Sequence, residues 1–328
     1  MSSLNLYFYS ANILIVFYLA NMKKKFHSVI VLTIGLCAVL LSSCSENISS
    51  SLPFDSSSFF SNETSNSESE TTSTSSNNNS TSTTTSSSTS TSYGGESTSY
   101  YSGNYYNSIT DSMSGTTLSK ALASIVKIDS TSRSYDWSRY EAADEALDDS
   151  TSILCLYTRH NIKKTSHCGN YSWNTWNREH IWTQSKYPQS KTDNHNIFAC
   201  EGQINNYRGN LKFGEVEHTS KNRLTVFGNL TNCYKTSSIF EPCDEAKGEV
   251  ARSVLYGVVM YNYNITNMLD VETALKWNVE HPVTERDIKR NDVVYSLQKN
   301  RNPFSDHPEY ACRIWGSTNS NTKQICGM

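Results

Sequence analysis

Apolar side chains recur at helical spacing in four segments after residue 117. In the first segment, Leu118, Leu122 and Ile125 are three or four positions apart, which places their side chains on one face of an α-helix. Pro282 and Thr284 mark the start of another helix, because proline and threonine are favoured at helix N-termini. The spacing predicts four helices, at about residues 118–128, 140–147, 248–261 and 283–298.

Strand patterns are few and short. The continuous apolar run at residues 153–157 predicts one buried strand, whereas residues 168–190 are rich in Asn, Trp and Ser and show no clean period. The chain contains no internal repeat. This balance predicts an α+β domain that is mainly helical and has a small sheet.

Two apolar runs precede the helical segments, at residues 4–20 and 29–41. Three lysines come shortly before the second run, and a charged stretch followed by a short apolar run is the pattern of an export signal. The run ends in Leu-Ser-Ser-Cys, which resembles the processing box of bacterial lipoproteins and predicts a lipid on Cys44. A plain secretory signal or a membrane helix is the alternative. We expect Met22 to be the true start; a start at Met1 would make the first run a short transmembrane candidate.

The segment that follows the leader has an unusual composition. Of the 40 residues from Ser61 to Tyr100, 32 are Ser, Thr or Asn. Such a stretch buries too little apolar surface to offset the entropy of ordering it. We therefore expect a leader at residues 1–43, a disordered linker at 44–117 and one folded domain at 118–328, placed outside the cytoplasm as a lipid-anchored surface protein or a secreted one.

The net charge of the whole chain is −3, but the acidic excess lies outside the domain. Residues 120–328 carry 25 Lys and Arg and 24 Asp and Glu. A near-neutral domain neither favours nor excludes a nucleic-acid partner, so the partner must be inferred from the site. We expect a monomer.

Seven of the nine cysteines lie in the domain. Export permits disulfides, and short loops favour the pairs Cys233–Cys243 and Cys312–Cys326, with Cys155–Cys168 as a further candidate and Cys200 left over. A zinc site is the alternative, but no Cys-x-x-Cys spacing occurs.

The residues with catalytic potential are concentrated between 176 and 210. Adjacent Glu179 and His180 alternate faces on a strand, but at a bent strand end the carboxylate could hold a cation while the imidazole faces a water. Asn205 offers a second oxygen ligand, and two oxygen ligands plus water suit Mg²⁺. A Glu-His pair alone is more often a surface or capping pair. The polar runs nearby favour a site, because buried amides and histidines orient one another.

Several motifs, in order, are similar to those of the bacterial endonuclease I family. They are REHIWTQS at 178–185, DNHN at 193–196, QINNYRGN at 203–210, EP at 241–242, KGEVAR at 247–252, LKW at 275–277, RN at 290–291 and QKNRNPFSDHPE at 298–309. The resemblance extends over roughly residues 118–316. It implies a ββα-metal (His-Me finger) core, in which two short strands and a helix frame the site.

The resemblance also implies roles for individual residues. His180 falls at the general base, and Glu179 and Asn205 fall at the ligands of one divalent ion, Mg²⁺ or another such as Ca²⁺ or Mn²⁺. Arg208 is expected one helical turn beyond Asn205, facing the phosphate.

Three more residues are expected to contact or orient the substrate. Arg178 is a candidate because no Arg lies between residues 180 and 205, where some relatives have one. Trp182 could stack on bases, as could Trp173 and Trp176, although such tryptophans more often fill the core. His195 is expected to orient the site.

The chain departs from the family pattern at two places, with Thr183 and the Ala199-Cys200 pair standing where proline is usual. Neither change removes a proposed ligand or base. The function expected is an exported, metal-dependent, non-specific endonuclease that hydrolyses DNA, RNA or both and leaves 5′-phosphate ends. The alternative is an inactive binding or adhesion lipoprotein on a nuclease scaffold.

Overall fold

The computed structural model describes residues 99–127, 134–168 and 173–328. The predicted leader, Cys44 and most of the predicted linker lie outside these residues. The packed part of the chain begins before residue 118, because Tyr106 is buried and its hydroxyl donates to Asp306 (2.7 Å). No helix within the described ranges is both long and apolar enough to cross a membrane.

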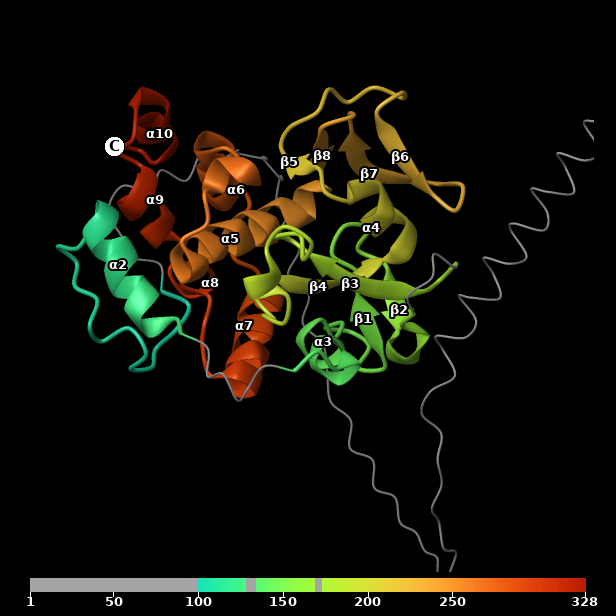
Figure 1. Ribbon diagram of the computed structural model, residues 1–328, viewed down its shortest axis with the longest axis horizontal. Coiled ribbons are helices and arrows are strands. Elements are labelled where there is room, and N and C mark those ends of the chain that lie inside the picture. Colours follow the sequence, from blue (N-terminus) through green and yellow to red (C-terminus); the bar gives the residue numbers. More distant parts are fainter. Residues whose placement is uncertain (1–98, 128–133, 169–172) are drawn as a thin grey trace, which may run out of the picture. The chain divides into compact units, whose positions relative to one another are not determined.

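Helix α5 (Asp244–Tyr261) lies in the middle of the helical part (Figure 1). Most of its residues are buried around the whole circumference, so it forms the core rather than a surface helix. The other helices are α2 (Gly115–Ile125), α3 (Trp137–Ala143), α4 (Gly202–Arg208), α6 (Val271–Glu280), α7 (Glu285–Gln298), α8 (Pro303–Asp306), α9 (Glu309–Trp315) and α10 (Ser320–Ile325). Single 3₁₀ turns occur at Lys164–Ser166, Pro188–Ser190 and Ile265–Asn267.

The four predicted helices correspond to α2, α3, α5 and α7. The start of α7 is confirmed: Thr284 caps it and forms a reciprocal capping box with Asp287. Helix α3 begins and ends earlier than predicted. It ends at Ala143 because the next residue, Asp144, turns its carboxylate inward to Arg286 and Arg290.

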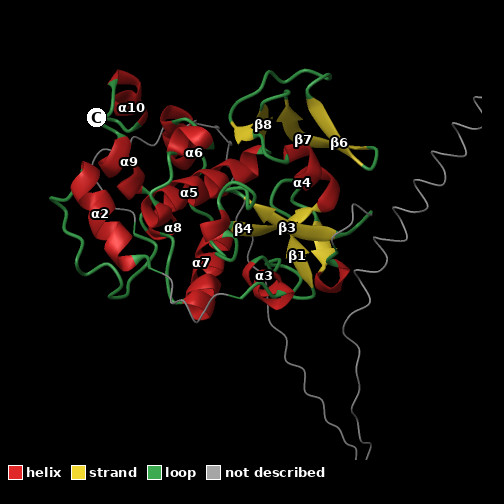
Figure 2. Ribbon diagram, viewed as in Figure 1, coloured by secondary structure: helices red, strands yellow, loops and turns green. Residues whose placement is uncertain are grey.

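The strands form three small sheets rather than one (Figure 2). The predicted strand at 153–157 is present as β1 (Ser152–Leu154), which ends sooner and pairs with β2 (Asn161–Lys163). The pattern of apolar residues does not indicate the strands of the other two sheets. They are β3 (Trp176–His180), β4 (Ile197–Glu201), β5 (Lys212–Phe213), β6 (Arg223–Val226), β7 (Asn229–Lys235) and β8 (Ile239–Glu241). The prediction of a mixed α+β domain is confirmed.

Strands β3 and β4 pair antiparallel, with His180 opposite Ile197 and Trp176 opposite Glu201. Helix α4 follows β4 directly, and it contacts both strands. Two strands and a helix therefore meet where β3 ends, at Glu179 and His180. The four-stranded sheet, in the order β5-β8-β7-β6, lies beyond α4.

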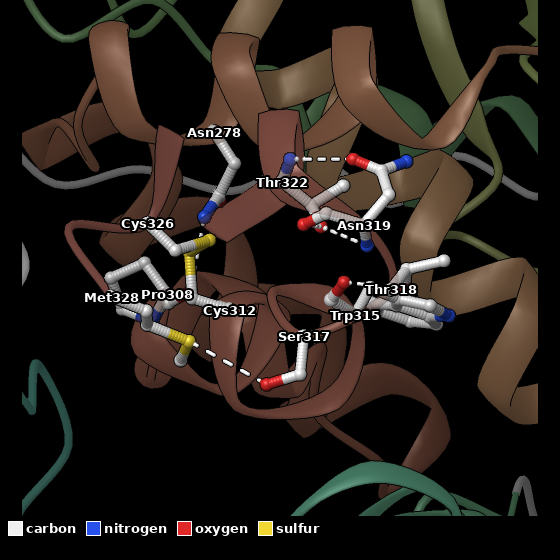
Figure 3. The surroundings of a disulfide bond; sticks show 10 residues. All are labelled: Asn278, Pro308, Cys312, Trp315, Ser317, Thr318, Asn319, Thr322, Cys326 and Met328. Atoms are coloured by element: carbon white, nitrogen blue, oxygen red, sulfur yellow. Dashed lines mark hydrogen bonds between the residues drawn. A yellow bond between two sulfur atoms is a disulfide. The ribbon is translucent and has the colours of Figure 1, made fainter. Parts of the chain in front are cut away.

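Of the three suggested disulfides, the Cys312–Cys326 bond is confirmed, and it ties α9 to the end of α10 (Figure 3). The other two suggestions are wrong, because Cys155, Cys233 and Cys243 are free thiols. Cys233 donates its S–H to the Tyr157 carbonyl instead (3.2 Å). Cys200, the residue left over, is a buried thiol.

Candidate active site

A polar cavity of about 300 Å³ opens beside the end of β3. It is lined by residues of β3, of the loop after β3, and of α4 and the turn beyond it: Asn177, Arg178, Glu179, His180, Thr183, Gln184, Ser185, Asn205, Asn206, Arg208, Gly209 and Asn210. The structure thus brings together five of the residues singled out from the sequence, namely Arg178, Glu179, His180, Asn205 and Arg208.

Glu179 is a buried carboxylate with incomplete pairing. The Tyr157 hydroxyl donates to its Oε1 (2.7 Å), and Arg208 Nη1 lies 2.9 Å from the same oxygen. Burial raises the pKa of Glu179 above its usual value, even though Arg208 and Tyr157 act to lower it. The Tyr157 and Arg208 side chains and a backbone hydrogen bond at His180 therefore do not stabilise this charge fully, and an added cation would favour the ionised form.

His180 is almost completely buried at the end of β3. Burial lowers the pKa of its imidazole to about 4, so the ring is neutral at pH 7. Nε2 lies 3.1 Å from the carbonyl oxygen of Lys191, which can only accept a hydrogen bond. This carbonyl favours the tautomer with the proton on Nε2, which leaves Nδ1 as the basic atom.

Asn205 presents its oxygen to the cavity. Its Nδ2 donates to Asn177 Oδ1 (2.7 Å) and to the Arg178 carbonyl (3.2 Å), which uses both amide hydrogens. Oδ1 receives no hydrogen bond from the described residues and is available as a ligand. The Asn177 side chain thus sets the orientation of the Asn205 amide.

Arg208 lies at the last turn of α4 and is fully buried. Besides pairing with Glu179, it donates to the carbonyls of His180 (2.6 Å) and Ile181. Its guanidinium therefore braces Glu179 and the end of β3. The direct contact with a phosphate that the sequence suggested stays a prediction.

Arg178 is held by stacking. Its guanidinium carbon lies 3.6 Å from the centre of the Tyr135 ring and 3.9 Å from that of Trp137. Nη1 donates to the Tyr135 carbonyl (2.8 Å). An arginine fixed between two rings keeps its charge at one place on the cavity wall, on the same strand face as His180.

Trp182 and His195 do not line the cavity. The burial of Trp182 agrees with core packing rather than with stacking on bases, whereas the orienting role expected of His195 stays a prediction. Trp182 is fully buried against α5, where a Cβ at Gly257 would lie 2.1 Å from its Nε1. His195 is buried beside Tyr256, with Nε2 3.2 Å from the Asn300 carbonyl. The pattern could not show this burial, because it depends on α5 and on the chain after α7.

Four residues that hold the site's side chains in place are not indicated by the sequence. Tyr157 and Asn177 fix Glu179 and Asn205, the Lys191 carbonyl fixes the His180 ring, and Tyr135 stacks on Arg178. Tyr157 is the last residue of the predicted strand at 153–157, where the pattern indicates only a buried position. Hydrogen bonds of this kind join distant segments, so the local pattern carries no signal for them.

The donor set fits a hard divalent cation. Within the described ranges, no three His, Cys, Asp or Glu side chains gather as a metal site. The cavity instead offers one carboxylate and one amide oxygen, and Mg²⁺ accepts such a pair because it retains several waters. The underpaired Glu179 and the open Asn205 Oδ1 support this fit.

A neutral imidazole can act as a general base, and here it lies beside a carboxylate, an amide oxygen and an arginine. This combination of groups is typical of the active site of a hydrolase. Comparison with known proteins identifies the class further. The model of the endonuclease I family matches residues 114–309, so the chain belongs to the endonuclease I family. It is a nuclease that acts on phosphodiester bonds.

Relatives agree with this assignment. The chain is 32% identical over 226 residues to an extracellular ribonuclease of Bacillus amyloliquefaciens. The aligned region covers 62% of this chain and 75% of the relative. It is 33% identical over 201 residues to an extracellular ribonuclease of Bacillus subtilis (strain 168), covering 55% and 67%. An extracellular deoxyribonuclease of Aeromonas hydrophila is 24% identical over 136 residues, covering 40% and 56%.

Proposed function

We propose that this chain is an exported, metal-dependent endonuclease that cleaves DNA, RNA or both with little sequence preference. His180 is the general base, and Glu179 and Asn205 hold one divalent ion, Mg²⁺ or a similar cation. The observation that carries the proposal is the meeting of a neutral imidazole, an underpaired carboxylate and an open amide oxygen in one cavity.

The arrangement of β3, β4 and α4 supports a His-Me finger core for this site. The base ends the first strand, the second strand returns antiparallel, and the following helix supplies Asn205. The helix also supplies Arg208, which holds Glu179 against β3. This order of strand, strand and helix is the one implied by the resemblance of the motifs.

The side chains of the cavity divide the work of hydrolysis. Nδ1 of His180 takes a proton from the attacking water, while the Lys191 carbonyl keeps the ring in the required tautomer. Arg178, fixed between two rings, places a positive charge beside the scissile phosphate. A bound divalent ion would neutralise charge on the phosphate and on the leaving 3′-oxygen. The products would carry 5′-phosphate ends.

Arg208 acts in this scheme as a positioning residue. It holds the carboxylate of Glu179 and the carbonyls of His180 and Ile181 in a single buried network. Metal ligands that are oriented in this way lose less freedom when they bind.

The relatives support a location outside the cytoplasm. Several are named as extracellular or periplasmic nucleases. The export signal and the processing box that ends at Cys44 lead us to propose a lipid-anchored form. Mass analysis of the mature N-terminus tests this: an acylated Cys44 supports the anchor, and an unmodified N-terminus elsewhere excludes it.

The test of the proposed function is plasmid nicking and RNA cleavage with Mg²⁺, with and without EDTA. We expect EDTA to abolish cutting and His180→Ala to lower the rate by about 10²- to 10⁴-fold, the usual contribution of a general base. His218→Ala, at an exposed histidine away from the cavity, is the matched control and should cut at the wild-type rate. An unchanged rate in His180→Ala would contradict the base assignment.

A further inference from the structure

The three tryptophans around the site motif differ sharply in exposure. Trp176 and Trp182 are fully buried, whereas 59% of Trp173 is exposed. A single exposed apolar side chain needs no functional explanation. A flat aromatic face open to solvent next to a nuclease site is of interest only if a second feature points to the same place.

Phe227 is that second feature. Its ring lies edge-to-face against Trp173, with centroids 5.4 Å apart and planes at 84°. Phe227 and Gly228 form the two-residue turn between β6 and β7, and both have positive φ, +48° and +86°. Asn, Asp or Gly is usual at the first position of such a turn, and a bulky side chain is strained there. A strained residue at this position indicates that its side chain is needed.

The Trp173–Phe227 pair lies near the start of β3, the strand that carries Glu179 and His180. Trp173 comes four residues before Asn177, which lines the cavity, so the two backbones are at most about 14 Å apart. The Phe227 amide donates to the side chain of Gln203, in the same short helix as Asn205. The turn between β6 and β7 and the start of β3 lie side by side in Figure 1.

Core packing accounts for only part of this pair. Phe227 is partly buried and packs against the hydrophobic core, whereas more than half of Trp173 stays in solvent. An aromatic face of this kind stacks on nucleobases without regard to sequence, because every base has a π-face. In a duplex both faces of each base are already stacked, so only an unpaired base can use the platform without unstacking.

We propose that Trp173, supported by Phe227, is a stacking subsite for an unpaired base of the bound strand, and that it makes single-stranded nucleic acid the preferred substrate. This inference rests on the proposed nuclease site and adds the substrate class to it. The contact is to the base, so it serves single-stranded RNA and single-stranded DNA alike.

The test compares KM and kcat of wild type and Trp173→Ala on a single-stranded RNA, a single-stranded DNA and a duplex DNA of the same sequence. We expect KM to rise roughly 5- to 100-fold on both single strands, the usual effect of losing one stacked base, with kcat almost unchanged. The duplex KM should change little. Trp173→Phe should retain most of the affinity. Equal effects on single strands and duplex, no effect on any substrate, or a loss on RNA alone would overturn the proposal.

Leu230→Ala is the matched control. Leu230 is 66% exposed on the same β6–β7 hairpin but has no aromatic face, so its loss should leave every KM unchanged. A Leu230→Ala effect as large as that of Trp173→Ala would mean that general apolar contact is responsible, which contradicts stacking.

A binding measurement separates this inference from the proposed function. In a His180→Ala background, a single-stranded oligonucleotide should quench tryptophan fluorescence, and the quenching should disappear when Trp173→Phe is added. Absence of cutting by wild type would refute the nuclease mechanism, whereas the same quenching with and without Trp173 would refute the stacking subsite alone.

Discussion

Two buried groups of carboxylates and arginines differ in how completely the carboxylates are paired. The active-site pair is Glu179 with Arg208. The structural cluster consists of Asp144, Glu249, Arg159, Arg286 and Arg290, and it holds α3, α5 and α7 to β4. The side chains of both groups are buried, so burial alone does not distinguish the active-site pair from the structural cluster.

The carboxylate oxygens show the difference. In the structural cluster, Glu249 uses one oxygen for Arg159 (2.7 Å) and the other for Arg286 (3.4 Å). Burial alone would raise the pKa of Glu249, but Arg159 and Arg286 outweigh it and lower the pKa to about 2. In the active-site pair, both side-chain bonds end on Oε1 of Glu179, and the pKa is raised. A fully paired carboxylate stabilises the fold, and an underpaired one leaves room for a ligand.

Removing Asp144 should have the largest effect on stability. Its carboxylate contacts Arg286, Arg290 and the amide of Ala199, so Asp144→Ala removes the carboxylate that pairs with Arg290 and one of the two that pair with Arg286. We expect a loss of about 3–5 kcal/mol in the free energy of unfolding, measured with urea. Glu215→Ala, which breaks an exposed pair with Lys276, should cost less than about 1 kcal/mol. Similar losses in the two variants would contradict the role of the cluster.

Acid should weaken the structural cluster through Glu249. Its folded pKa of about 2 lies below the usual 4.5, so its contribution is complete above pH 4.5 and is lost as the pH falls from 4.5 toward 2. The shift corresponds to about 3 kcal/mol. The unfolding free energies of wild type and Glu249→Gln should therefore converge over this range. Parallel curves would show that Glu249 does not titrate as described.

Tyr157→Phe tests the active-site pair by removing the hydroxyl that donates to Glu179. The hydroxyl donates to Glu179 at a fully buried position, so we expect a loss of about 1.5–3 kcal/mol in stability. Cation affinity should also fall by about 10- to 100-fold, because Glu179 loses its orientation. Tyr263→Phe, whose hydroxyl bonds Gln189 at the surface, should change neither quantity. An unchanged cation affinity in Tyr157→Phe would refute its positioning role.

The sequence predicts features that depend on neighbouring residues better than features that depend on distant contacts. The α5 and α7 helices follow from local spacing and capping, and the convergence of Glu179, His180 and Asn205 follows from ordered motifs. The sequence left core packing and base stacking both open for Trp182, because the choice depends on contacts with α5. The burial of His195 depends on the chain after α7, which the local pattern does not show. The pairing of Arg208 was missed for a related reason, since a residue pattern does not reveal which partner a guanidinium faces.

The four-stranded sheet shows a second limit. Strand β5 has two residues and pairs in parallel with β8, whose paired residues lie 27 positions further along the chain. Strands this short carry too few positions for an alternating pattern to be recognised. The sheet matters for the inferred stacking subsite, because its β6–β7 turn brings Phe227 against Trp173.

Calorimetric titration of Mg²⁺ into the protein tests the central claim most directly, with wild type compared with Glu179→Gln and Glu249→Gln. We predict one ion per chain in wild type and in Glu249→Gln, and no measurable binding in Glu179→Gln at the same concentrations. Wild-type binding in Glu179→Gln, or its loss in a folded Glu249→Gln, would contradict the assignment of the underpaired carboxylate as the metal ligand.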